Sequence, residues 1–289
     1  MSDHLISVRN LRVSFPTRSG RFEAVRGVSF DLGRERLGVV GESGSGKSMT
    51  GRAILGLVRP PGQVTADRLE LDGDNLLNLP ERRMRRIRGG RISMVMQDPK
   101  FSLNPVMTVG RQIIEAWRQH NRASRAEARQ KALEMLAAVQ IRDPERVFDA
   151  YPHEVSGGMG QRIMIAMMLA PDPEVLIADE PTSALDVSVR TEVLHIMDRL
   201  VRDRGMGLIF ISHDLNLVSQ FCDRVLIMYA GRIVEELAAR DLHRARHPYT
   251  QGLLNSLPRL DQRVERLAVL QRQDSWREAE ILPPPPGGL

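Results

Sequence analysis

A run of eight residues, GESGSGKS at positions 41–48, constrains the fold of this chain more than any other feature. It fits the pattern G-x-x-x-x-G-K-[ST] at every position, between an apolar strand pattern at 37–40 and a helical pattern through 57. The glycines let backbone N–H groups turn inward around phosphate groups, at the positive end of the following helix. Lys47 is expected to reach the β- and γ-phosphates, and Ser48 to ligate Mg²⁺. The predicted nucleoside triphosphate site comprises Gly41, Glu42, Ser43, Gly44, Ser45, Gly46, Lys47 and Ser48.

A second feature is the segment VLIADE at 175–180, an apolar strand pattern that ends in two adjacent carboxylates. Adjacent residues at a strand end point in different directions. Asp179 can therefore serve a metal ion while Glu180 faces the γ-phosphate and polarises an attacking water molecule. An acidic turn after a buried strand is the alternative interpretation, which a phosphate-binding loop upstream makes the weaker one.

The third feature is VSGGMGQR at 155–162, where a serine and two glycines open a helical pattern. A hydroxyl group, bare backbone N–H groups and a helix N-terminus together form a second anion-binding site. One chain has little use for two such sites on separate subdomains. We therefore expect two chains to face each other, each completing the other's site; an ordinary glycine-rich helix start is the alternative.

The remaining pattern is that of an α/β protein. Strand and helix patterns alternate up to about residue 97 and again after 173, while 101–170 is predominantly helical. We expect one long helical stretch over 108–138 and a further helix from just after 158 to 170. The chain divides into a domain at 1–257, with the helical insertion at 101–170, and an extension at 258–289 that is predicted to be largely disordered.

In this order, the motifs resemble those of the ATP-binding subunits of ABC transporters, over residues 5–257. The resemblance adds three further motifs: the Q-loop at Gln97, SALD at 183–186 and the histidine of IFISHD, His213. It implies a P-loop NTPase (RecA-like) core with an N-terminal antiparallel β subdomain and an inserted α-helical subdomain. It also implies an ATPase that uses ATP and Mg²⁺.

The resemblance also implies a role for each site residue. Glu180, His213 and Gln97 are the expected catalytic residues: His213 contacts the γ-phosphate, and Gln97 senses Mg²⁺ and the attacking water. Mg²⁺ is expected at Ser48, Gln97 and Asp179. Phe15 best matches the aromatic residue that stacks on adenine; Phe22 is the alternative, and plain core packing of Phe15 is a third interpretation. The residues expected to act across the interface between two chains are Ser156, Gly157, Gly158 and Asp186.

Local segments resemble the peptide and nickel importer branch of this family. They are MQDPKFSLNP after Gln97, YPHEVSGGM before the helix, and HPYTQGLLNSLP near the C-terminus. Met159 stands where the family usually has glutamine, a feature of the same branch. The implied function is import of a dipeptide or oligopeptide, with nickel or a metal chelate as the alternative. The implied partners are a similar but distinct second ATPase, two transmembrane permease subunits that meet the insertion near 99–121, and indirectly an extracytoplasmic solute-binding protein.

Composition narrows the alternatives. The chain has one cysteine, Cys222, which excludes an internal disulfide and an iron–sulfur cluster. Its 41 basic and 36 acidic residues give a net charge of +5, but the basic residues are scattered and predict no nucleic-acid partner. No apolar run reaches the roughly 18 residues of a membrane helix, and no secretory signal is visible. We expect a peripheral protein at the cytoplasmic face of the bacterial inner membrane; a soluble ABC ATPase acting on ribosomes or DNA, and an exporter ATPase, are the rival interpretations.

Overall fold

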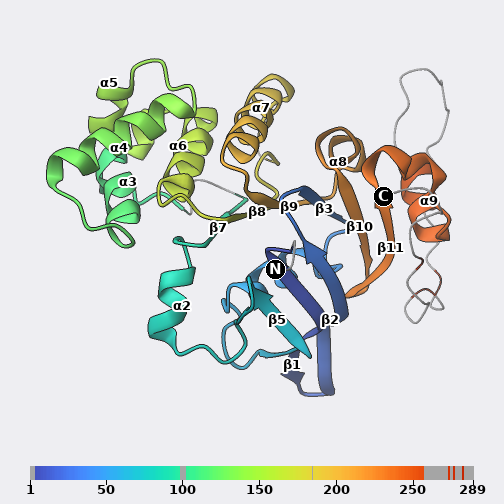
Figure 1. Ribbon diagram of the computed structural model, residues 1–289. Coiled ribbons are helices and arrows are strands. Elements are labelled where there is room, and N and C mark those ends of the chain that lie inside the picture. The colour runs from blue at the N-terminus through green and yellow to red at the C-terminus, as the bar shows by residue number, and fades with distance from the viewer. Residues whose placement is uncertain are drawn as a thin grey trace. The chain divides into compact units, whose positions relative to one another are not determined.

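The computed structural model describes residues 4–97, 102–183, 185–256, 273, 276 and 282. The chain divides into two compact units, one formed by 1–78 together with 209–289 and the other by 79–208. Figure 1 shows their elements. The first unit holds most of the strands, and the second holds most of the helices.

The first unit begins with an antiparallel sheet in the order β2-β1-β5-β6, with β4 also paired to β1. The long strands β1 (Ile6–Thr17) and β2 (Gly20–Leu32) lie side by side, with Val13 opposite Val25. Alternate residues of β1 are buried, as a sheet with one face on the core requires. The short strands are β4 (Gln63–Thr65), β5 (Arg68–Leu71) and β6 (Asp74–Asn75). The predicted N-terminal antiparallel subdomain is thus confirmed.

The same unit contains a second set of strands in the order β11-β10-β3-β9. Strand β3 (Arg36–Val40) pairs parallel with β10 (Arg224–Tyr229), which pairs antiparallel with β11 (Arg232–Ala238). Every residue of β9 (Gly207–Ser212) is buried, and so is nearly every residue of β3 and β10. Such continuous apolar strands are typical of a parallel sheet covered on both faces.

The described residues of the first unit also form the helical elements α1 (Lys47–Ile54), α8 (Leu215–Phe221), the 3-10 turn η3 (Ala239–Arg244) and α9 (Pro248–Asn255). Helix α8 packs closely on β3, because a Cβ atom on Gly38 would lie 2.4 Å from Val218 Cγ1 and 3.2 Å from Cys222 Sγ. Cys222 is buried, and this burial raises the pKa of its thiol far above the usual range. Helix α9 was not expected from the sequence.

The second unit contains two parallel strands, β7 (Ile92–Val95) and β8 (Val175–Asp179), with Met94 opposite Ile177. Between them in sequence run the helices α3 (Val109–Arg118), α4 (Arg125–Ala138), α5 (Pro144–Asp149), the turn η2 (Pro152–Glu154) and α6 (Gly157–Leu169). Helices α3 to α6 pack against one another and form the predicted helical insertion (Figure 1). Helices α2 (Glu81–Ile87) and α7 (Val187–Asp203) flank this segment in the sequence.

The expected single helical stretch over 108–138 is wrong in one respect. Helix α3 ends at Arg118, and α4 begins at Arg125 after a break. The break arises at Ser124, whose side chain accepts the Glu127 N–H at 3.2 Å while Glu127 accepts the Ser124 N–H at 2.7 Å. This reciprocal capping box satisfies the free N–H groups that a new helix start exposes.

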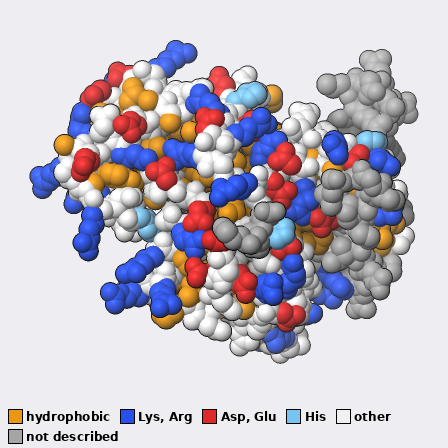
Figure 2. Space-filling view, in the orientation of Figure 1, with side chains coloured by type: hydrophobic (Ala, Val, Ile, Leu, Met, Phe, Trp, Pro, Cys, Tyr) orange, Lys and Arg blue, Asp and Glu red, His pale blue; other side chains and the backbone are white. Residues whose placement is uncertain are grey.

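None of the helices in the described part of the chain is long and apolar enough to cross a membrane. On the face drawn in Figure 2, Lys and Arg side chains are interspersed with Asp and Glu side chains. Many of these charges form ion pairs, such as Arg36 with Asp223 at 2.5 Å and Arg91 with Glu174 at 2.5 Å.

One charged cluster fastens the two sheets of the first unit. The Arg224 guanidinium, 13% exposed, contacts both Glu35 oxygens, the Asp31 carbonyl at 2.6 Å and the Glu236 carboxylate. Burial alone lowers the pKa of Arg224, but hydrogen bonds and the charges of Glu35 and Glu236 outweigh it and raise the pKa. Arg224 therefore joins β2, the turn before β3, β10 and β11.

We predict that Arg224→Met destabilises the chain, because two carboxylates and a carbonyl lose their shared donor in a mostly buried place. The expected loss is about 2 to 4 kcal/mol of unfolding free energy, measured by chemical denaturation. Arg85→Met is the matched control, since Arg85 is 77% exposed and its ion pair is with the exposed Glu81. Equal effects of the two substitutions would contradict the assigned role of Arg224.

Candidate functional site

The loop 41–48 joins β3 to α1 and is shaped by three glycines. Gly44 and Gly46 have φ angles of +81° and +102°, a region that glycine enters at little cost. A Cβ atom on Gly41 would lie 2.1 Å from the Met228 carbonyl oxygen, and one on Gly46 would lie 2.6 Å from the Ala24 carbonyl oxygen. Two of these glycines therefore permit backbone to pass against backbone, and the loop is seated firmly against β2 and β10.

Lys47, the first residue of α1, points back into the loop. Its ammonium group donates to the Gly41 carbonyl at 2.7 Å and to the Glu42 carbonyl at 2.8 Å, and lies 3.5 Å from Ser45 Oγ. The side chain is 5% exposed. A buried cation at a helix N-terminus, surrounded by a turn of backbone, makes this place strongly favourable for an anion.

The geometry fits a phosphate group. Helix α1 starts immediately at Lys47, so the free N–H groups of its first turn lie beside the Lys47 ammonium group. Ser48 follows on the same helical turn, where a hydroxyl group can serve as a Mg²⁺ ligand. These residues would hold the phosphates of a nucleotide and its metal ion.

The two carboxylates of the second motif lie at the end of β8. Asp179 is the last residue of the strand and is 5% exposed, whereas Glu180 is half-buried in the following turn. Glu180 has a φ angle of +47°, an uncommon conformation for a residue with a side chain. The Ser183 N–H and hydroxyl groups hold the Glu180 carbonyl oxygen at 3.3 and 3.2 Å, which fixes this turn. The two carboxylates thus differ in exposure, and their roles toward a metal ion and the γ-phosphate stay predictions.

Gln161 is a residue of this site whose role the sequence did not reveal. It lies on α6, is 1% exposed, and donates from Nε2 to the Pro181 carbonyl, next to Glu180. The buried amide therefore connects the glycine-rich helix to the turn that carries Glu180. A polar residue on the buried face of an otherwise apolar helix was the available signal.

The third motif caps α6. Ser156 accepts the Met159 N–H at 3.3 Å, so its hydroxyl group lies at the helix N-terminus as predicted. A cavity of about 380 Å³ opens there, lined by Ser156, Gly158 and Met159 together with Arg142, Arg146 and Arg162. Arg162 also bonds Glu192 and the Gln140 carbonyl. The carboxylates of Asp143 and Glu192 also line this cavity and pair with Arg146 and Arg162, so the three guanidinium groups and the helix N-terminus leave it only a small excess of positive charge.

The two glycines of this motif differ in what surrounds them. A Cβ atom on Gly158 would lie 2.6 Å from Val189 Cγ1, so that packing of α6 on α7 requires a glycine there. Around Gly157 nothing lies within 4 Å of such an atom, and the residue is exposed. The packing of the described residues therefore explains Gly158 but leaves Gly157 available for a role toward an external molecule.

Three further predicted residues lie at the ends of secondary-structure elements. Gln97 is exposed, two residues beyond β7, and His213 is exposed in the turn between β9 and α8. Asp186 caps α7 by accepting the Val189 N–H at 3.0 Å. Its side chain thus has a structural role in its own chain, in addition to the coupling role expected from the resemblance.

The two candidate aromatic residues face each other across β1 and β2. Phe15 and Phe22 are paired in register, with Phe15 half-buried and Phe22 59% exposed. Phe15 packs over Gly62, because a Cβ atom there would lie 2.6 Å from Phe15 Cε1. Stacking of Phe15 on adenine stays a prediction, and so does the alternative at Phe22.

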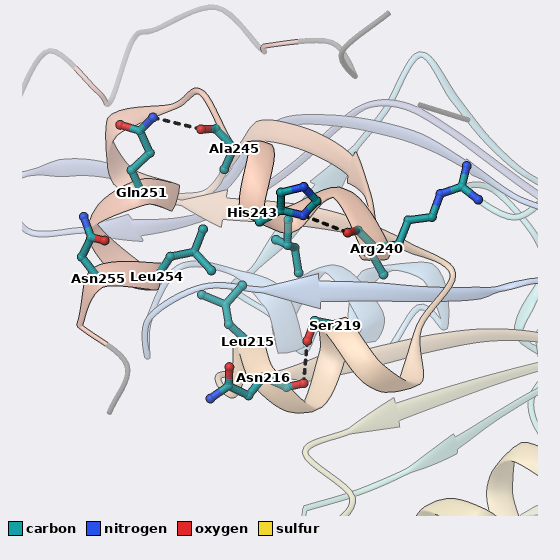
Figure 3. Close-up of a pocket in the computed structure, with 11 residues that line it drawn as sticks. Leu215, Asn216, Ser219, Arg240, His243, Ala245, Gln251, Leu254 and Asn255 are labelled. Atoms are coloured by element: carbon teal, nitrogen blue, oxygen red, sulfur yellow. Dashed lines mark hydrogen bonds between the residues drawn. The ribbon is translucent and has the colours of Figure 1, made fainter. Parts of the chain in front are cut away.

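The structure brings the predicted residues together in two groups. Loop 41–48, Phe15 and His213 belong to the first unit; Gln97, Asp179, Glu180, Asp186 and the 156–158 nest belong to the second. A separate cavity of about 580 Å³ lies between α8, η3 and α9 of the first unit (Figure 3). It is lined by Leu215, Arg240, His243 and Gln251, among others, and by none of the predicted site residues.

Comparison with known proteins identifies related chains. The family model described as ABC transporter matches residues 25–183. A probable peptide ABC transporter ATP-binding protein, y4tR of Sinorhizobium fredii, is 51% identical over 89% of this chain and 78% of its own length. The dipeptide transport ATP-binding protein DppD of Bacillus subtilis is 45% identical over 99% of this chain and 85% of its own. The oligopeptide transport ATP-binding protein OppD of Escherichia coli is 45% identical over 93% and 80%.

Solved structures share the fold. The dimeric structure of MJ0796, a bacterial ABC transporter cassette, matches with a TM-score of 0.72 at 27% identity, over 81% of this chain and 99% of that one. A second structure of the same cassette, in a post-hydrolysis state with ADP and Pi, matches with a TM-score of 0.72 at 26% identity, over the same shares. The predicted P-loop NTPase core is confirmed by these matches.

We predict different effects of alanine at the two adjacent glycines of α6. Gly158→Ala must displace Val189 and is expected to cost about 1 to 3 kcal/mol of unfolding free energy. Gly157→Ala meets open space and gains helix propensity, so its stability is expected to match or exceed that of the wild type. Thermal melts of the two variants measure this difference, and an equal loss in both would contradict the packing described for α6 and α7.

Proposed function

Because this chain belongs to the ABC transporter family, we propose that it is the ATP-hydrolysing subunit that powers import of dipeptides or oligopeptides. Peptides are proposed as the solute because the chain is 45% identical, over 99% of its length, to a dipeptide transport ATP-binding protein. Its activity as an ATPase follows from the family and from the likeness to a cassette that was solved with ADP and Pi.

Nucleotide binding is assigned to loop 41–48. Its backbone N–H groups and the N-terminus of α1 bind the phosphates, and Lys47 exchanges its loop carbonyls for phosphate oxygens. Ser48, with Asp179 and Gln97, holds Mg²⁺, which neutralises charge on the β- and γ-phosphates when bound. Phe15 is proposed to stack on adenine, with Phe22 as the alternative.

Hydrolysis is assigned to Glu180, which accepts a proton from the attacking water molecule as that molecule approaches the γ-phosphate. The turn that carries Glu180 is held by Ser183 and, through Pro181, by Gln161, so the carboxylate is positioned before the reaction. His213 contacts the γ-phosphate and Gln97 orients the water. Catalysis then depends mainly on position and charge, as is general for phosphoryl transfer.

The second chain supplies the rest of the site. Ser156, Gly157 and Gly158 of one chain contact the γ-phosphate bound by the other, and Asp186 couples the two sites. The open space around Gly157 and the positive cavity beside it support this assignment. The solved structure of the related cassette MJ0796 is described as dimeric. Closure of the two chains around bound ATP performs the mechanical work, and ATP hydrolysis then resets the pair of chains.

The proposed assembly contains this chain, a similar but distinct second ATPase and two transmembrane permease subunits at the cytoplasmic face of the inner membrane. An extracytoplasmic solute-binding protein delivers the solute to the permeases. The ATPase domain is assigned to 1–257 and an extension to 258–289. Residues 102–121 of the insertion are proposed to meet a permease; residues 99–101 of the predicted contact lie outside the described residues.

We predict that Glu180→Gln lowers ATP turnover by roughly two to four orders of magnitude, because the water molecule loses its proton acceptor. ATP affinity is expected to be retained, since Glu180 does not belong to the phosphate-binding loop. Steady-state phosphate release and equilibrium ATP binding measure the two quantities. Glu134→Gln, at an exposed carboxylate on α4, is the matched control and is expected to leave both unchanged. ATP turnover near that of the wild type would show that Glu180 is not the proton acceptor.

A tagged Glu180→Gln chain, isolated from its native membranes with ATP and Mg²⁺, is expected to retain its partners, because closure persists without hydrolysis. Mass spectrometry should identify two multi-span proteins and a second P-loop ATPase. Uptake of a labelled dipeptide and of nickel, by cells with and without those permeases, then distinguishes the solutes. Ribosomal proteins or DNA, with nothing from the membrane, would contradict the importer assignment.

A further inference from the structure

Loop 41–48 has a side-chain partner that lies far away in the sequence. Tyr249, the second residue of α9, is fully buried, and its hydroxyl group accepts the Glu42 N–H at 3.1 Å across a separation of 207 residues. The HPYT segment that contains Tyr249 was noted in the sequence only as a family resemblance. In the structure it is in direct contact with the loop.

The Glu42 residue is bonded on both sides. Its N–H group donates to Tyr249, and its carbonyl accepts Lys47 Nζ at 2.8 Å. A bound phosphate attracts the Lys47 ammonium group, which must then give up loop carbonyls. The bond to Tyr249 does not involve Lys47 and has no need to break in this exchange. Tyr249 can therefore keep the entrance of the loop in place while Lys47 changes partners.

Tyr249 is itself held on several sides, so its hydroxyl group has a fixed position. Its ring lies 4.6 Å from that of Tyr229 and 6.1 Å from that of Trp276, centroid to centroid. Its N–H donates to His247 Nδ1 at 3.1 Å. Burial lowers the pKa of His247, against the opposing effect of the Glu235 charge, and so favours the neutral ring that can accept this bond. Trp276 thus places part of the C-terminal extension against the residue that contacts the loop.

The start of α9 is also hydrogen-bonded to strand β11. Glu235 of β11, which is fully buried, accepts the Arg246 and His247 N–H groups at 2.7 and 3.2 Å. Gln251 of α9 donates to the Ala245 carbonyl at 2.9 Å, the bond drawn in Figure 3. The segment from 245 to 251 is therefore held against β11 by hydrogen bonds, and the Tyr249 side chain reaches from this segment to loop 41–48.

We propose that Tyr249 is a positioning residue for ATP binding, which holds the Glu42 backbone so that the N–H groups of loop 41–48 stay directed at the phosphates. The C-terminal segment around α9 is then part of the support of the nucleotide site. This inference rests on the nucleotide site proposed above.

The test compares Tyr249→Phe with Tyr229→Phe in the full-length chain. The first removes the hydroxyl group that bonds Glu42, and the second removes one from the neighbouring ring of the same cluster. Titration calorimetry with MgATP is expected to give a Kd raised roughly 3- to 10-fold for Tyr249→Phe, the equivalent of one hydrogen bond, and unchanged for Tyr229→Phe. Unfolded chains lower only the stoichiometry, so a loss of stability does not imitate this result.

A double-mutant cycle with Glu42→Pro identifies the path of the effect, because proline has no N–H to donate. In the Glu42→Pro background, Tyr249→Phe is expected to change the Kd no further. A full additional loss there, or a Kd for Tyr249→Phe equal to that of the wild type, overturns the inference. If the wild type binds MgATP no better than Lys47→Ala, the nucleotide site itself is misassigned, and the two failures are thereby distinguished.

Discussion

The nucleotide-binding half of this molecule depends on backbone passing directly against backbone. A Cβ atom on Gly41 would lie 2.1 Å from the Met228 carbonyl oxygen, and one on Gly46 would lie 2.6 Å from the Ala24 carbonyl oxygen. The Gly231 N–H adds a bond to the Ser45 carbonyl at 3.0 Å. The loop is therefore shaped by its neighbouring strands as much as by its own residues. A turn held in this way keeps its N–H groups converging before any ligand arrives, which is what preorganised anion binding requires.

The second unit applies the same principle to a carboxylate. Glu180 adopts an uncommon backbone conformation, and the cost is sustained because Ser183 and Gln161 bond the turn on two sides. Gln161 lies on the helix that Ser156 caps, so its hydrogen bond to the Pro181 carbonyl joins α6 directly to the turn that carries Glu180.

Much of this arrangement could be predicted from local sequence patterns and from the spacing of the motifs. The motifs at 41–48 and 175–180 could be placed because an apolar strand precedes the first and forms most of the second. Such buried strands leave a clear run of hydrophobic residues. The break before α4 was missed although Ser124 and Glu127 show the capping-box spacing, since a continuous helical composition covers it. The contact of Tyr249 with Glu42 could not be predicted, because no local pattern connects residues 207 positions apart.

The sole cysteine has a practical consequence. Cys222 lies against Val218 and beneath Gly38, where burial raises the pKa of its thiol, so we expect it to react slowly with alkylating reagents. The native sequence is therefore already a suitable background for site-specific labelling. A cysteine introduced at an exposed position such as Val187, 74% accessible at the start of α7, would carry a spin label or fluorophore almost alone. Distances between such labels can follow the approach of two chains without prior removal of a native thiol.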